Sequence, residues 1–153
     1  MDITLKNKMR WLLLILVPFL LANCQVMLIG AYDEHVDQTL QQISKELSLV
    51  FVKVEKNIDD NRPDDNKYEK FRDSYIEILS NVENLKIRTN SLPKYTRVTQ
   101  QISLLTQNIK DLESLHKIGL TNKNVLESAK TLIETSLGSM LSAQNALKRE
   151  KAN

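Results

Sequence analysis

The spacing of apolar residues after position 33 most constrains what this chain can fold into. It alternates in steps of three and four, which returns side chains to one face of an α-helix. Three breaks interrupt the pattern: turn formers and a proline at 59–66, a second proline at 90–93, and a glycine at 119. Such residues end helices or make turns. The sequence therefore predicts four helices.

Each predicted helix has one apolar face. The first begins at Asp33–Glu34, whose acidic side chains suit the positive end of a helix dipole, and its face consists of Val36, Leu40, Ile43, Leu47, Val50 and Val54. The second runs from about Asp65 to Thr89, with a face of Tyr68, Phe71, Tyr75, Ile78, Val82 and Leu85. The third face is Tyr95, Val98, Ile102, Leu105, Ile109 and Leu112. The fourth face is Ala129, Leu132, Ser136, Met140, Ala143 and Leu147.

The ends of these helices carry recognisable signals. Pro93 suits the first turn of the third helix, and Gly119 is expected to cap its C-terminus. Asn124 and Glu127 have the spacing of a capping box at the start of the fourth helix.

The predicted fold class is all-α. Four helices of about 25 residues joined by short connections pack naturally as an antiparallel, up-down-up-down four-helix bundle. A three-helix bundle with a docked first helix is the alternative.

The N-terminus has the pattern of an export signal. Lys6, Lys8 and Arg10 precede an apolar run at 11–22, and Cys24, the only cysteine, follows it. A charged start, a short apolar run and small or polar residues at its exit are typical of a cleaved signal peptide.

Leu21-Ala22-Asn23-Cys24 resembles the lipobox of bacterial lipoproteins, although Asn23 departs from the usual Gly, Ala or Ser. The resemblance implies cleavage between Asn23 and Cys24, a diacylglyceryl thioether on Cys24 and acylation, for example by palmitate, of its new amino group. Two or three acyl chains anchor a protein stably. Gln25, in place of an aspartate, resembles lipoproteins of the outer membrane that face the periplasm.

An uncleaved membrane anchor is the competing interpretation. Residues 11–32 could span a bilayer, which needs about 20 residues, and the N-terminus would then lie in the cytoplasm. Asn23 and Gln25 would be costly inside the membrane, and Pro18 would interrupt the helix. The favoured division is a signal peptide at 1–23, a lipidated N-terminus and tether at 24–32, and a helical bundle domain at 33–153.

Charge and cysteine content exclude several classes of function. After removal of residues 1–23, 18 basic and 18 acidic residues remain, so the net charge is zero. Nucleic-acid binding requires a basic stripe, and we expect none. With Cys24 lipidated, no thiol is left for a disulfide or a metal site.

The mature chain resembles a family of small bacterial lipoproteins without an assigned activity. The residues that carry this resemblance are Cys24, 28–34, Asp37, 52–55 and 111–116. It implies an exported helical lipoprotein and brings no catalytic residues with it.

Two candidate metal sites have simpler interpretations. Glu113 and His116 have the i, i+3 spacing of di-iron bundles, but such sites need a second pair, and His35 has no partner at that spacing. We expect His116 to lie at the surface or at a helix end. The acidic segment Asp59 to Asp65 lacks the glycine and the closing glutamate of a calcium loop and is predicted to be a solvated turn. We expect no catalytic residue, cofactor or metal.

Two stretches without charged residues, 98–109 and 135–147, are predicted to lie side by side. Their outward residues, among them Gln101 and Gln144, could form a docking surface for a membrane partner or a second copy, since interface centres are depleted of charge. Alternatively, Gly138 and Ala143 simply allow close helix packing.

The function expected from the sequence is that of a non-enzymatic, membrane-tethered interaction or envelope-maintenance protein. A small-molecule or metal-binding bundle is one alternative, which requires inward-facing polar groups. The other is a single-pass inner-membrane subunit with an uncleaved anchor.

Overall fold

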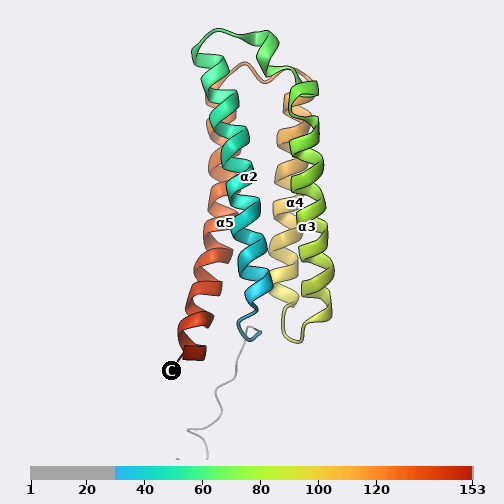
Figure 1. Ribbon diagram of the computed structural model, residues 1–153, viewed down its shortest axis with the longest axis vertical. Helices are drawn as coiled ribbons and strands as arrows, with labels where there is room; N and C mark the ends of the chain where they lie inside the picture. Colours follow the sequence, from blue (N-terminus) through green and yellow to red (C-terminus); the bar gives the residue numbers. More distant parts are fainter. Residues whose placement is uncertain (1–29, 153) are drawn as a thin grey trace, which may run out of the picture.

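The computed structural model describes residues 30–152, which form four α-helices and, in this part of the chain, no strand (Figure 1). The helices are α2 (Glu34–Asp59), α3 (Arg72–Ser91), α4 (Thr96–Lys117) and α5 (Lys123–Ala152). Two short 3-10 helices, η1 (Pro63–Asn66) and η2 (Tyr68–Lys70), connect α2 to α3. The predicted all-helical bundle of four helices is confirmed.

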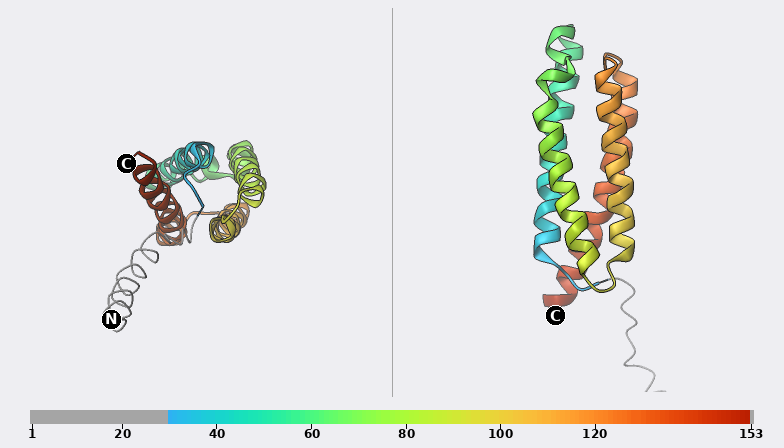
Figure 2. Two further views of the ribbon diagram at one scale, coloured as in Figure 1. Left: turned by 90° about the horizontal axis from the view of Figure 1, so that it is seen from below. Right: turned by 90° about the vertical axis from the view of Figure 1, so that its right-hand side faces the viewer.

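Each helix packs against two others around a single core. α2 and α4 both contact α3 and α5, and the end-on view shows the four helices arranged in a ring (Figure 2). The connections α2–α3 and α4–α5 lie at one end of the bundle, here called the Asn66 end (Figure 1). The start of the described chain, the α3–α4 connection and the last turn of α5 lie at the other end. This end is here called the Gly30 end, because Gly30 lies against Pro93 and Tyr95 of the α3–α4 connection.

The predicted apolar faces of α2 and α4 are confirmed, because all twelve of their residues are buried. On α3, Tyr75, Ile78, Val82 and Leu85 are buried as predicted. Tyr68 and Phe71 precede α3 and still pack against the core. α2 thus contributes to the same core as the other three helices.

The predicted face of α5 is only partly confirmed. Met140 and Leu147 are buried as predicted, but at three of the six predicted positions the buried residue is the next one along the chain. Leu132 is 61% exposed, although it was expected in the core. The buried residues of α5 are Leu126, Ile133, Leu137, Met140, Gln144 and Leu147. Small and polar residues of α5 occur on more than one of its faces. The sequence pattern alone therefore does not determine which face is buried. Contact with α2 and α4 selects the face that carries the larger side chains.

Two helix starts also differ from the prediction. α3 begins at Arg72 rather than near Asp65, because the segment after Pro63 winds into η1 and η2 instead. Pro93 lies in the turn before α4, which begins at Thr96. In that turn Lys94 adopts a φ of 65°, a conformation that cannot continue a right-handed helix.

The helix caps are partly as predicted. The Asp33 carboxylate accepts a hydrogen bond from the Val36 amide at 2.9 Å and caps α2. Gly119 follows the end of α4 with a φ of 100°, which confirms its role as a C-terminal cap. The capping box of Asn124 and Glu127 is wrong. The cap of α5 is Asn122, whose side-chain oxygen accepts from the amides of Asn124 and Val125.

The predicted export signal, with Asn23 and Cys24, lies outside the described residues. Within 30–152, none of the helices is both long and apolar enough to cross a membrane.

Candidate functional site

A buried polar cluster occupies the Asn66 end of the bundle, centred on His116, which is only 1% exposed. Its Nε2 donates to the backbone oxygen of Asn66 at 2.8 Å. A carbonyl oxygen can only accept, so Nε2 carries the proton and Nδ1 is free to accept from the Tyr75 hydroxyl at 3.1 Å. The neutral imidazole therefore has both of its hydrogen bonds satisfied.

The expectation of a surface or helix-end histidine was right about the helix end and wrong about exposure. His116 lies in the last turn of α4, but the Phe71 ring packs on it, with centroids 4.6 Å apart. Burial lowers the pKa of His116 below its ordinary value of 6.5 and is the main cause of a raised pKa at Tyr75.

Asn66 extends the cluster to both connections. Its side-chain nitrogen donates to the backbone oxygen of Val54 at 3.1 Å and to that of Leu120 at 3.4 Å. These carbonyls belong to the last part of α2 and to the α4–α5 connection. The cluster holds the loops together, and we interpret it as structural.

Glu113 takes no part in a metal site with His116. Its Oε1 accepts from the Tyr68 hydroxyl at 2.7 Å and pairs with the Lys117 ammonium at 2.8 Å. Partial burial opposes ionisation of Glu113, but these two hydrogen bonds outweigh it and lower its pKa. Between residues 30 and 152 there is no group of three or more His, Cys, Asp or Glu side chains that could hold a metal ion.

The acidic segment at 59–65 is paired with basic side chains. Asp60 and Asp65 pair with Arg62, and Asp59 pairs with Lys123 at 2.9 Å. Its carboxylates are partly or largely exposed, as the prediction of a solvated turn requires.

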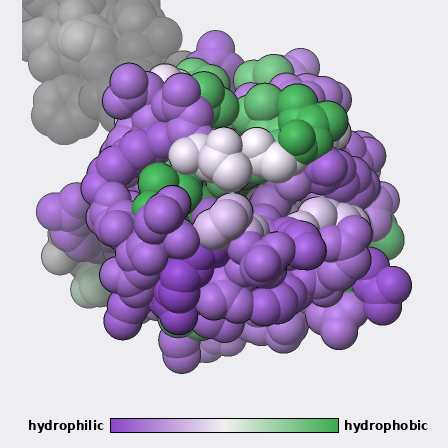
Figure 3. Space-filling model, turned by 90° about the horizontal axis from the view of Figure 1, so that it is seen from above, coloured by the Kyte–Doolittle hydropathy of each residue, from purple (hydrophilic) through white to green (hydrophobic). Residues whose placement is uncertain are grey.

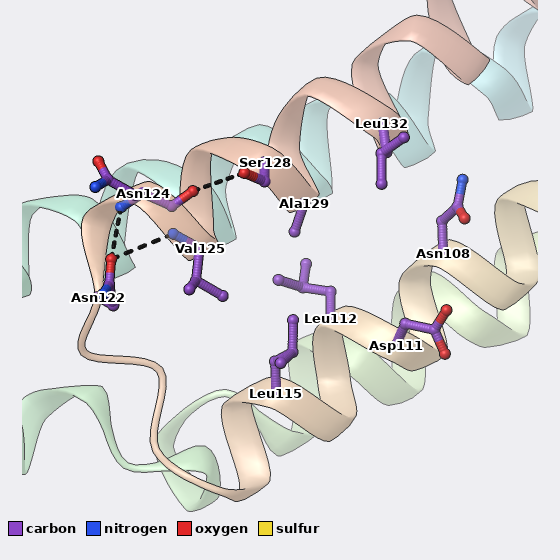
Figure 4. A pocket seen from close by; sticks show the side chains of 10 residues that line it. All are labelled: Asn108, Asp111, Leu112, Leu115, Asn122, Asn124, Val125, Ser128, Ala129 and Leu132. Atoms are coloured by element: carbon purple, nitrogen blue, oxygen red, sulfur yellow. Dashed lines mark hydrogen bonds between the residues drawn. The ribbon is translucent and has the colours of Figure 1, made fainter.

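A groove between α4 and α5 is the candidate binding site of the described chain (Figure 4). It has a volume of about 380 Å³. Its floor is apolar, made by Leu112, Leu115, Val125, Ala129 and Leu132. Its rim is polar, made by Asn108, Asp111, Asn122, Asn124 and Ser128. Such a site suits an apolar group bounded by hydrogen-bonding partners.

The groove lies toward the Asn66 end, along the second half of α4 and the first half of α5. Viewed from that end, most of the surface is hydrophilic, with the largest hydrophobic area toward the upper edge and smaller ones elsewhere (Figure 3). Ile118, in the connection next to the groove, is 83% exposed.

The groove shares only Asn108 with the uncharged stretches 98–109 and 135–147. The prediction that Gln144 faces outward is wrong, because Gln144 is 1% exposed, whereas Gln101 is half-buried. Leu104, in the first stretch, is 65% exposed. These stretches therefore present fewer outward polar groups than the sequence indicates.

The core holds polar groups that the sequence analysis missed. Five polar side chains are buried, one on each of α2, η1, α3, α4 and α5: Asp37, Asn66, Thr89, His116 and Gln144. The sequence holds a signal for three of them, because Thr89, His116 and Gln144 each follow a buried apolar residue of the same helix by four positions. The Gln144 side-chain oxygen has no hydrogen-bond partner within the described chain.

Comparison with known proteins finds no matching family model, no matching curated protein and no matching solved structure.

Proposed function

We propose that this protein is an exported bacterial lipoprotein, anchored through lipid on Cys24, with a non-enzymatic helical domain that binds a protein partner in the periplasm. The observation that carries the proposal is Leu21-Ala22-Asn23-Cys24 at the exit of a short apolar run behind a basic start. The outer membrane is the proposed location, since Gln25 rather than an aspartate follows the cysteine.

The proposed topology is an antiparallel alternation of helices, up-down-up-down. In support, Asp33 at the start of α2 bonds to Arg88 near the end of α3, at 2.9 and 2.6 Å. At the opposite end, Lys123 of α5 bonds to Asp59 of α2. In the proposed protein, the anchor at Cys24 precedes Gly30 by six residues, so the Gly30 end would lie nearest the membrane and the α4–α5 groove toward the far end.

The groove supports binding of a partner because its floor is apolar and partly exposed. A solvent-exposed leucine such as Leu132 has no role in the core, and Val125, which is 39% exposed, lines the same groove. The uncharged stretches extend the same two helices toward the Gly30 end. Apolar, uncharged centres with polar rims are typical of protein interfaces.

The first experiment is the intact mass of the protein extracted from membranes. The proposal predicts a chain that begins at Cys24 and carries acyl groups, and predicts its loss in Cys24→Ala. A full-length chain that is indifferent to the substitution would instead establish the uncleaved anchor of an inner-membrane subunit.

The second experiment tests the groove by crosslinking in cells. Leu132→Glu should remove crosslinked complexes, because it puts a charge on the apolar floor. Ile87→Glu is the matched control, since Ile87 is 60% exposed on α3, outside the groove, against 61% for Leu132. Complexes that survive Leu132→Glu would contradict docking at this site. A charged substitution at Gln144 is unsuitable for testing the uncharged stretches, because Gln144 is buried and a charge there would disrupt the core.

A small apolar ligand is a second candidate occupant, favoured by one observation. The volume of about 380 Å³ lies within the range of roughly 300–1,000 Å³ typical of small-molecule sites. Native mass spectrometry of the purified protein would reveal a retained ligand, and Leu132→Glu should release it.

A further inference from the structure

The charges of the bundle are distributed unequally between its ends. Residues 30–152 contain 18 basic and 18 acidic residues. The Gly30 end, taken as 30–38, 86–98 and 145–152, holds seven basic residues and four acidic ones, a net charge of +3. The remainder of the described chain therefore carries −3. A neutral domain with one basic end has a directional electrostatic field.

Two of the four acidic groups at the Gly30 end are already engaged. Asp33 accepts two hydrogen bonds from Arg88, and Asp37 is buried and accepts from Tyr32 and Gln41. Only Glu34 and Glu150 remain as exposed acidic groups.

Five basic side chains at this end are exposed, and none forms an ion pair with another described residue. They are Lys94, Arg97, Lys148, Arg149 and Lys151. Two of them, Lys148 and Lys151, lie over the Tyr32 ring, at 5.7 and 5.6 Å from its centroid. This contact joins the end of α5 to the segment where the described chain begins.

Helix stability explains only part of this basic group. Cations in the last turn of α5 suit the negative end of its dipole. Arg97, however, lies in the first turn of α4, where a cation is unfavourable and where no acidic residue occurs. Lys94 lies in the preceding turn, at a φ of 65°. Neither Arg97 nor Lys94 therefore stabilises a helix of the bundle through its charge.

We propose that the Gly30 end binds the anionic lipid headgroups of the membrane that carries the lipid anchor, an inference that rests on the function proposed above. Only residues 25–29 separate Cys24 from Gly30, so the anchored atom and the bundle lie at most about 20 Å apart. Electrostatic attraction acts over a Debye length of about 8 Å at physiological salt. The tether therefore keeps the Gly30 end close to the bilayer and permits Lys94 and Arg97 to approach the headgroup phosphates to within that distance.

The experiment uses the full processed protein in vesicles, with one engineered thiol for a fluorescent label. Ser91→Cys places the label at the Gly30 end and Thr121→Cys places it at the Asn66 end, both at exposed positions. The vesicles consist of phosphatidylcholine alone or with phosphatidylglycerol, and each contains lipids with a quencher on the headgroup. We expect stronger quenching of the Ser91 label in the anionic vesicles, its loss in high salt, and no dependence on lipid charge for the Thr121 label.

Charge reversal provides the matched comparison. Lys94→Glu, Arg97→Glu and Lys151→Glu together should abolish the lipid-charge dependence. Lys53→Glu, Lys56→Glu and Lys110→Glu change the net charge equally at exposed sites away from the Gly30 end and should preserve it. A Ser91 label that is quenched equally in both vesicles, or a reversal variant that keeps its dependence, would overturn the inference. Thiol titration of the unlabelled wild type separately reports on the anchor, since a lipidated Cys24 leaves no free thiol.

Discussion

His116 makes the stability of this bundle depend on pH. The unfolded chain exposes an imidazole of ordinary pKa, near 6.5, whereas burial lowers the pKa in the folded protein. The unfolded state therefore binds the proton more readily, and stability is lost as the pH falls through 6.5 toward the lower folded value. Urea unfolding at pH 7.5 and 5.5 should show the loss, and His116→Gln should reduce it. An equal loss in His116→Gln would assign the effect to other groups.

Gly30 is the position at which even one methyl group is excluded. A Cβ there would overlap the Tyr95 ring, whose hydroxyl donates to the backbone oxygen of Ala31 at 2.6 Å. We expect Gly30→Ala to destabilise the protein by about 1–3 kcal/mol, as overpacking does. Gly138→Ala is the control. A Cβ at this exposed helical position meets nothing within 4 Å, so the change should stabilise by about 0.5–1 kcal/mol. Thermal unfolding of both variants tests the contrast.

At the scale of the element, α5 depends on a cap that the sequence pattern misplaces. Asn122 satisfies two amide donors at the start of α5, so Asn122→Ala should cost about 1 kcal/mol. Asn124→Ala should cost under about 0.5 kcal/mol, as exposed substitutions usually do. Chemical denaturation distinguishes the two, and the reverse order of costs would restore the capping box predicted from the sequence.

The individual helices show what their sequences determine. In α2 and α4, the regularly spaced large apolar residues define a single helix face. The sequence therefore predicts the buried faces of these two helices correctly. In α5, Leu132 and Ile133 are adjacent large apolar residues, and only one of them can face the core. Packing against α2 and α4 buries Ile133 and leaves Leu132 exposed. The groove arises from that choice, because it leaves Leu132 on the surface. The start of α3 is predicted too early, because Pro63 and the residues after it form 3-10 turns. A hydrogen bond from a residue distant in the sequence, His116, stabilises these turns, and no local pattern indicates it.

At the scale of the whole molecule, all four helices share one core, so we expect one cooperative unfolding transition. Leu47→Ala in α2 and Leu105→Ala in α4 remove fully buried side chains and should each cost about 2–5 kcal/mol. Leu104→Ala, beside Leu105 but 65% exposed, should cost under about 0.5 kcal/mol. Circular dichroism during urea unfolding tests this. A separate early transition in Leu47→Ala alone would mean that α2 is only docked on a three-helix core.

The contact between Gly30 and Tyr95 has a mechanical consequence. If the chain is tethered at Cys24, a pull on the anchor enters the fold at Gly30 and Ala31 and passes through the Tyr95 hydroxyl to the start of α4, as well as along the backbone into α2. The load is thus shared between two helices at one end of the bundle (Figure 2). Tension on the tether would strain this end first, and the α4–α5 groove would keep its shape while the anchor is under load.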